Sequence, residues 1–374
     1  MIINAKIKSI IVTFIAYFWM KLFLNKVPIS KQIKSILLVF PSGIGNTILA
    51  NGAIKSIKKH YPYAELTVVY MQRSTKDIIT IIGGFKELVY YDISNERKEG
   101  NQFINRIKAK NVDISVSFFP QGSYSFNKKL MQARIPTRIG FLLPRSFGGI
   151  RSVLFLSHCF MYNPKISEFR NNLNLLKHLD VPLEKSVSFR LNKYNIIKVT
   201  GDKTRIGFHV GRPNAQRPGW SIENFSKLIF LLRNKYEADI FVFGGSEEME
   251  VSRCLEDIFK KHINNYIGEK SLEETIDYIH SMDLFVSNDT GLMHIAASQG
   301  IPLIALFGPT DAVKSLPILQ NNKKYIIIKK ESLCSPCYPQ APQVACNGRV
   351  PCMKNITPDE VLISIEELTS RIKV

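Results

Sequence analysis

The side chains best suited to chemistry lie in one stretch, LFVSNDTGLMHIAASQGIPLIALFGPTD, residues 284–311. Its opening apolar run predicts a strand, and a polar residue before Thr290 can cap the helix that follows. The first N–H groups of such a helix and its positive dipole end suit a phosphate, and Gly291 lets an anion approach the backbone. His294 lies about one helical turn after Thr290 and can face the same site. The pattern predicts a phosphate site; the alternative is a helix cap beside a buried histidine.

A second apolar run follows at 302–307 and ends in another turn, at Gly308. In an open α/β sheet, ligands bind in the crevice at the carboxyl ends of the strands. Two such turns on successive strands favour the crevice over the simple cap.

Strands and helices that can position this site alternate along both halves of the chain. In the first half, apolar runs at 34–40, 64–70 and 112–119 predict strands. In the second half, strands are expected at 204–210 and 238–245, and helices at 221–236, 247–261 and 271–281. The polar stretch 191–203 reads as a linker. The pattern predicts two doubly wound parallel α/β sheets, facing each other across a cleft.

Charge differs sharply between the two halves of this chain of 374 residues. Residues 1–190 contain 28 Lys and Arg against 10 Asp and Glu, whereas residues 191–374 contain 22 against 21. The basic half predicts an anionic partner, such as a phosphorylated substrate or an acidic membrane surface; a merely soluble basic surface is the alternative. No nucleic-acid-binding module is recognisable, so nucleic acid is not expected as a partner.

Residues 1–30 read as an N-terminal basic and apolar extension. The apolar run from Ile10 to Met20 is shorter than the roughly 20 residues needed to span a bilayer. No small-residue cleavage site follows it, so a secretory signal is not expected. Apolar and aromatic residues flanked by lysines predict a helix in the interface of an anionic membrane. The alternative is a helix packed on the domain.

Four of the six cysteines are clustered in the loop 334–352 with the spacing C-x2-C-x8-C-x5-C. Four thiols at this spacing can form a tetrahedral sulfur site for zinc or iron. The open alternatives are free thiols in a packed loop, and disulfides. A metal here would be structural, held by Cys334, Cys337, Cys346 and Cys352.

The segment SNDTGLMHIAASQGIPLIALFGPTD resembles the signature of glycosyltransferase family 9, the heptosyltransferases of lipopolysaccharide assembly. The segments ILLVFPSGIGN, IGFHVGRPNAQRPGW and the cysteine-containing tail resemble other parts of that family, so the similarity covers roughly residues 34–374. The resemblance implies the GT-B fold and inverting transfer of a sugar from a nucleotide diphosphate, without a metal cofactor for catalysis. It implies an acceptor-binding domain at 31–192 and a donor-binding domain at 193–374.

The resemblance also assigns roles to residues. Backbone N–H groups at the start of the helix would stabilise the leaving diphosphate. Arg212 and Arg217 lie where family members carry a phosphate-binding lysine, although the match to the family's pattern, a Lys just before a Trp-Pro pair, is imperfect. The donor-binding residues it implies are Arg212, Arg217, Asp289, Thr290, Gly291, Leu292 and His294.

The Gly-rich turn of Ser42, Gly43 and Gly45 is expected to meet the acceptor. The family carries an Asp as general base just after it, whereas this chain has Asn46, whose amide cannot accept a proton at neutral pH. Asp92 and Asp113, near predicted strand ends, are candidate replacements. If neither carboxylate is the base, the acceptor is bound in a different geometry from the family's, with Asn46 positioning it, or catalysis is weak.

The resemblance implies a donor such as ADP-heptose and an anionic acceptor of the lipopolysaccharide core. Together with the extension 1–30, it predicts a cytoplasmic enzyme peripheral on the inner face of the bacterial cytoplasmic membrane. Transfer of a hexose or N-acetylhexosamine, a protein acceptor, an epimerase on the same fold and a catalytically inactive binding protein remain alternatives.

Overall fold

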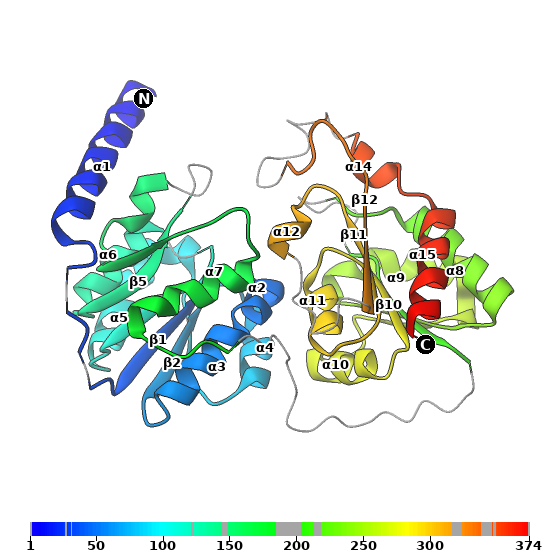
Figure 1. Ribbon diagram of the computed structural model, residues 1–374, viewed down its shortest axis with the longest axis horizontal. Coiled ribbons are helices and arrows are strands. Elements are labelled where there is room, and N and C mark those ends of the chain that lie inside the picture. The colour runs from blue at the N-terminus through cyan, green and yellow to red at the C-terminus, as the bar shows by residue number, and fades with distance from the viewer. Residues whose placement is uncertain are drawn as a thin grey trace. The chain divides into compact units, whose positions relative to one another are not determined.

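A computed structural model describes residues 2–26, 28–30, 32–120, 123–143, 149–184, 203–211, 218–315, 324–337, 346 and 349–372, with the backbone alone at 2–9 and 97. The chain divides into two compact units, residues 1–185 and 186–374 (Figure 1). Of the predicted linker 191–203, only residue 203 is among those described.

Unit 1 is built on a parallel sheet whose strands run in the order β3-β2-β1-β4-β5-β6. The central strand β1 is buried along its whole length, as its apolar sequence SILLVF predicts. The strands are β1 (Ser35–Phe40), β2 (Glu65–Tyr70), β3 (Glu87–Tyr90), β4 (Ile114–Ser117), β5 (Thr137–Leu142) and β6 (His158–Met161). The helices are α1 (Ile2–Phe23), α2 (Ile44–Leu49), α3 (Asn51–His60), α4 (Thr75–Ile82), α5 (Glu96–Lys108), α6 (Tyr124–Gln132) and α7 (Glu168–Leu175).

Unit 2 repeats the same plan, with strand order β12-β11-β10-β7-β8-β9. Its strands are β7 (Arg205–His209), β8 (Asp239–Gly244), β9 (Asn264–Ile267), β10 (Leu284–Asn288), β11 (Leu303–Phe307) and β12 (Tyr325–Lys329). Its helices are α8 (Ile222–Tyr236), α9 (Met249–Phe259), α10 (Leu272–His280), α11 (Gly291–Ser298), α12 (Ala312–Ser315), α14 (Pro351–Lys354) and α15 (Pro358–Ile372). Figure 1 shows α8 and α15 on one face of this sheet and α10 and α11 on the other.

Counted from its first strand, each sheet has the order 3-2-1-4-5-6 of a dinucleotide-binding fold, in which ligands bind where the strand order reverses. In unit 1 that point lies between β1 and β4, and in unit 2 between β7 and β10. The polar turns that follow β1, β7 and β10 are therefore the places to look for a site. The prediction of two doubly wound parallel sheets is confirmed.

Helix α1 packs on unit 1 through one of its faces. Ala16 is fully buried, and the indole N–H of Trp19 donates to the carbonyl oxygen of Leu156 at 2.8 Å. The side chain of Arg151, in a 3₁₀ turn at Gly149–Val153, donates to Thr13 at 3.0 Å. Among the described residues, no helix is long and apolar enough to cross a bilayer.

The side of α1 away from these contacts is apolar and open to solvent. Ile10, Phe14, Phe18 and Leu22 recur every fourth residue and are 68%, 71%, 57% and 45% exposed. Their spacing places them along one stripe of the helix. The extension thus both packs on the domain and leaves an apolar surface uncovered.

Candidate active site

The turn between β10 and α11 gathers four of the residues singled out in the sequence. Thr290 occupies the cap position of α11 in an extended conformation, and Gly291 begins the helix. His294 is buried one turn later, with its Nε2 3.7 Å from a carboxylate oxygen of Asp289. The first N–H groups of a helix lack intrahelical partners, so this turn presents donors to an anion at the carboxyl edge of the sheet.

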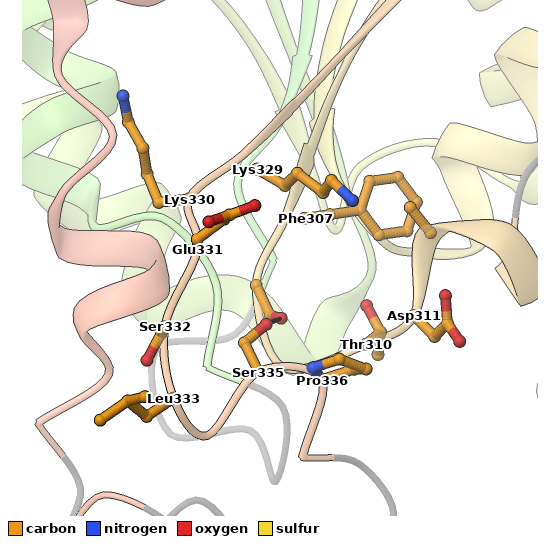
Figure 2. A pocket seen from close by; sticks show the side chains of 12 residues that line it. Phe307, Thr310, Asp311, Lys329, Lys330, Glu331, Ser332, Leu333, Ser335 and Pro336 are labelled. Atoms are coloured by element: carbon orange, nitrogen blue, oxygen red, sulfur yellow. Dashed lines mark hydrogen bonds between the residues drawn. The ribbon is translucent and has the colours of Figure 1, made fainter.

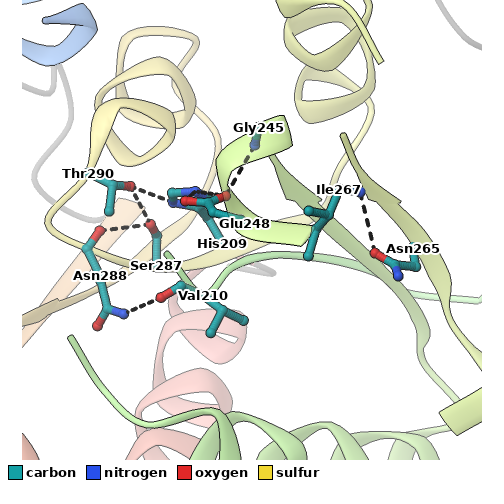
Figure 3. A network of polar contacts seen from close by, with 9 residues as sticks. All are labelled: His209, Val210, Gly245, Glu248, Asn265, Ile267, Ser287, Asn288 and Thr290. Carbon is teal, nitrogen blue, oxygen red and sulfur yellow. Dashed lines mark hydrogen bonds and ion pairs between the residues drawn. The ribbon is translucent and has the colours of Figure 1, made fainter. Parts of the chain in front are cut away.

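The Thr290 hydroxyl does not cap its own helix, because it belongs to a buried network with β7 (Figure 3). Its Oγ1 lies 2.7 Å from Nδ1 of His209, the last residue of β7, and 3.2 Å from Oγ of Ser287. The other ring nitrogen of His209 lies 3.2 Å from both carboxylate oxygens of Glu248. A Glu–His–Thr chain therefore runs across the point where the strand order reverses.

Glu248 reaches this position because β8 ends in Gly244 and a second glycine, Gly245, follows. Its Oε2 accepts a hydrogen bond from the Gly245 N–H at 3.1 Å. A Cβ placed on Gly244 would lie 2.1 Å from the same oxygen, which is a severe clash. The Gly-Gly pair thus makes room for a carboxylate that is folded back onto the strand end.

His209 and Glu248 were not among the residues predicted from the sequence. His209 ends an apolar strand run, and Glu248 lies 39 residues further along the chain. Two features of the sequence could have identified them: for His209, a polar residue at the carboxyl end of a predicted strand, and for Glu248, an acidic pair soon after Gly-Gly.

The Asn288 side chain joins β10 to the segment that follows β7. Its Nδ2 donates to the Val210 carbonyl oxygen at 2.7 Å, and its Oδ1 accepts from the Trp220 backbone N–H at 2.9 Å. Asn288 is buried, and the Trp220 indole in turn donates to Ile356 at 2.8 Å. Arg212 and Arg217, expected to bind phosphate, lie outside the described residues.

A pocket of about 560 Å³ opens at the carboxyl ends of the neighbouring strands β11 and β12 (Figure 2). Its walls include Thr310 and Asp311 from the Gly-Pro-Thr-Asp turn and Lys329 from the end of β12. The second turn noticed in the sequence thus borders a real cavity at this edge of the sheet.

In unit 1, the turn after β1 holds the residues expected to meet the acceptor. Helix α2 begins at Ile44, so Gly45 and Asn46 lie in its first turn. The Asn46 amide donates to the Ser42 hydroxyl. A Cβ on Gly43 would lie 3.0 Å from Oε1 of Gln72, so this backbone fits closely against its neighbour. The half-buried Asn46 sits at the carboxyl end of the central strand.

The two candidate replacement bases lie elsewhere. Asp113 precedes β4, and its carboxylate accepts from the backbone N–H groups of Lys34 and Ser35 at 2.8 and 3.0 Å, at the amino edge of the sheet. This is the opposite edge from Asn46, so the structure does not bring the two together. Asp92 follows the outer strand β3, where it caps a 3₁₀ turn and bonds to Ser94. The Ser94 hydroxyl and backbone N–H lower the Asp92 pKa.

Among the described residues, the clustered cysteines do not form a recognisable metal site. Cys337 and Cys352 are buried, and burial raises the pKa of the Cys352 thiol to about 11, with neighbouring thiols adding to the effect. Cys346 accepts a weak hydrogen bond from the Val350 N–H at 3.4 Å. In the part of the chain that the structure covers, no three His, Cys, Asp or Glu side chains could hold one ion. The predicted zinc or iron therefore finds no support in this geometry.

Comparison with known proteins places these observations in context. Residues 178–343 match the model of glycosyltransferase family 9 (heptosyltransferase). Lipooligosaccharide heptosyltransferase 2 of Campylobacter jejuni is 22% identical over 345 residues, covering 90% of this chain and 99% of that protein. Lipopolysaccharide heptosyltransferase 3 of Escherichia coli is 25% identical over 296 residues, covering 74% of this chain and 83% of that protein.

Solved structures agree on the fold. The E. coli ADP-heptose heptosyltransferase II superposes with a TM-score of 0.68 at 18% identity, covering 91% of this chain and 100% of that one. The E. coli heptosyltransferase WaaC with ADP gives a TM-score of 0.68 at 17% identity, covering 89% of this chain and 99% of that one. The expected GT-B class of fold is thereby confirmed.

Proposed function

We propose that this chain, a glycosyltransferase whose residues 178–343 match the family 9 model, transfers heptose from ADP-heptose to an anionic acceptor of the lipopolysaccharide core. The observation that carries the proposal is the turn at Thr290 and Gly291, which opens a helix at the strand-order reversal of unit 2. The names of the similar heptosyltransferases support the sugar and the acceptor.

In this proposal the diphosphate of the donor lies against the start of α11. The backbone N–H groups of Thr290, Gly291 and Leu292 bind its oxygens, and the helix dipole adds positive potential. Negative charge builds up on the diphosphate as the sugar leaves, so donors fixed beforehand stabilise the transition state. Asp289 and His294 form a buried pair beneath this turn and hold it in place.

Substitution at Gly291 tests the donor site. Gly291→Val puts a branched side chain where the anion must approach, and we expect ADP affinity to fall at least ~10-fold while the fold survives. Gly291→Ala is the graded control and should lose less. Calorimetry with ADP and ADP-heptose measures both, with circular dichroism to monitor folding. Unchanged ADP affinity in Gly291→Val would place the donor elsewhere, and preferential binding of UDP or of a hexose donor would point to the alternative substrates.

On the acceptor side, we propose that Asn46 positions the acceptor hydroxyl rather than taking its proton. Asn46 lies in the first turn of α2 and is bonded to Ser42, so its side chain is held at the carboxyl end of β1. Asp113 cannot serve as the base from the amino edge of the sheet. Asp92, which follows the outer strand β3, remains the candidate carboxylate at the carboxyl edge.

We further infer that the enzyme works at the inner face of the cytoplasmic membrane, with α1 as its contact. The exposed stripe of Ile10, Phe14, Phe18 and Leu22 can enter the interface, while the lysines of the basic half attract anionic lipid. Because Ala16 and Trp19 are tied to unit 1, lipid binding does not require α1 to leave the domain.

A flotation assay with vesicles tests this location. Phe14→Asp should reduce binding to phosphatidylglycerol-rich vesicles about 10-fold or more, since a charge replaces a ring that would enter the lipid. The matched control is Phe230→Asp on α8, because Phe230 is 59% exposed on the other unit. Equal losses in both variants, or equal binding to zwitterionic vesicles, would remove α1 as the membrane contact.

A further inference from the structure

We propose that His209, held by Glu248, is a positioning residue that turns the hydroxyl hydrogen of Thr290 toward the leaving diphosphate. The proposal rests on the proposed function, since it requires a nucleotide-diphosphate donor at the start of α11. It assigns a role to two buried side chains, His209 and Glu248, that make no other contribution to the mechanism described above.

The three groups form a continuous chain from β8 to α11. The His209 and Glu248 side chains are 7% and 9% exposed, and they lie 3.2 Å apart. His209 Nδ1 lies 2.7 Å from Thr290 Oγ1, which is a short, well-formed hydrogen bond. Thr290 in turn immediately precedes the helix start that meets the diphosphate.

The hydrogens in this chain can be assigned from the chemistry of each group. An ionised carboxylate only accepts, so His209 Nε2 must carry a hydrogen toward Glu248. Glu248 also accepts from the Gly245 N–H, which favours its ionised form. Nδ1 then has two states. Without a hydrogen, it takes the single hydroxyl hydrogen of Thr290; with one, it donates to Oγ1 and leaves that hydrogen available.

Ser287 determines where an available Thr290 hydrogen can point. The Ser287 hydroxyl donates to the Asn288 carbonyl oxygen at 2.8 Å, so its own hydrogen is committed. At 3.2 Å from Thr290, Ser287 can therefore only accept. When His209 is doubly protonated, the Thr290 hydrogen points either to this long contact or to an oxygen of the bound diphosphate, which is the stronger acceptor.

Acidic groups lie around His209 in the proposed donor complex. Glu248 faces its ring from the turn after β8, and Asp289 lies beside Thr290 on the turn after β10. Both are acidic, and the diphosphate adds further negative charge. Once the donor is bound, negative groups therefore lie on both sides of the His209 ring, one beside Nε2 and one beyond Thr290.

In the transfer step, the bond between the anomeric carbon and the diphosphate oxygen breaks, and its electron pair stays on that oxygen. The acceptor oxygen bonds to the anomeric carbon and loses its proton to solvent or to a base, while His209 keeps both of its protons. The hydrogen bond from Thr290 strengthens as charge develops, so it acts on the transition state and the product more than on the bound donor.

Calorimetry with two ligands gives a readout that a structural role would not produce. ADP carries the full charge of the departed diphosphate, whereas ADP-heptose represents the ground state. We expect Thr290→Val and His209→Ala each to weaken ADP binding about 10-fold or more, and ADP-heptose binding by clearly less. Thr290→Ser should retain the difference, and His262→Ala, at an exposed histidine of the same unit, should change nothing.

A double-mutant cycle completes the test. If His209 acts through Thr290, the double variant should lose no more ADP affinity than either single variant. The proposal would be overturned if the two substitutions lowered ADP affinity additively, or if they lowered the affinities for ADP and ADP-heptose equally. Wild-type ADP affinity in Thr290→Val would also overturn it, and this result can be obtained even if His209→Ala fails to fold. Failure of the wild-type protein to bind ADP at all would instead refute the proposed function.

Discussion

Replacement of Asn288 by alanine tests how the proposed donor site is held together. The change leaves the Trp220 N–H without its hydrogen-bond acceptor and the Val210 carbonyl oxygen without its donor, both in the buried interior. An unsatisfied buried polar group costs about 1–3 kcal/mol, so two of them should lower the free energy of unfolding by about 2–6 kcal/mol. A typical domain is stable by only about 5–15 kcal/mol, so this loss is large.

The measurement is urea unfolding followed by tryptophan fluorescence. The chain has two tryptophans, Trp19 in unit 1 and Trp220 in unit 2, so a Trp19→Phe background reports on unit 2 alone. The matched control is Asn265→Ala, where a half-buried amide bonds to Ser252 and water can replace it. We expect the control to lose about 1 kcal/mol or less.

A carboxyl group at the same position sharpens the test. In Asn288→Asp, a protonated carboxyl can accept from Trp220 and donate to Val210, whereas an ionised one puts negative charge against the Val210 carbonyl oxygen. The folded state would therefore bind the proton more tightly than the unfolded state, so stability should fall as pH rises from about 4 to 8. A loss below about 1 kcal/mol in Asn288→Ala, or no pH dependence in Asn288→Asp, would show that the amide is not holding these segments.

Two further predictions concern the turn proposed to meet the acceptor, and the thiols. Asn46→Asp should maintain or raise kcat, because the Ser42 hydroxyl can donate to a carboxylate in the same place. The pH dependence of kcat should then show the ionisation of a carboxyl group. Loss of activity in Asn46→Asp, with Asp92→Asn still active, would leave Asn46 as a positioning group only. Iodoacetamide at neutral pH should label the exposed Cys254 first, and Cys159 and Cys352 last, because burial raises the pKa of the Cys159 and Cys352 thiols to about 11. Mass spectrometry of tryptic peptides gives the order of labelling. Early labelling of Cys352 would contradict its burial.

Much of the fold follows from local patterns in the sequence. The strand β1 and the helices α8 and α10 lie within a residue of the predicted ranges, because apolar runs and serine caps mark them. The turn of Thr290 and Gly291 at the start of α11 is predictable for the same reason: a strand, a cap and a helix are adjacent in the chain.

The remainder of the site depends on contacts between distant segments. His209 and Glu248 meet because β8 pairs with β7, and Thr290 joins them because β10 pairs with the other side of β7. No local pattern encodes which strands become neighbours. Asp113 illustrates a different gap: it stands before its strand, and in a parallel sheet that places it at the amino edge, opposite the carboxyl edge where such folds bind ligands.

The contact between Gly244 and Glu248 also bears on how this sequence can vary. A Cβ at position 244 would come within 2.1 Å of the Glu248 carboxylate, so any side chain there displaces the acid from His209. The two positions are therefore not independent. Lineages that lose the glycine should lose the glutamate with it, and those that shorten residue 248 become free to accept a larger residue at 244. Paired substitution at these two sites would be the evolutionary trace of a carboxylate folded onto its own strand.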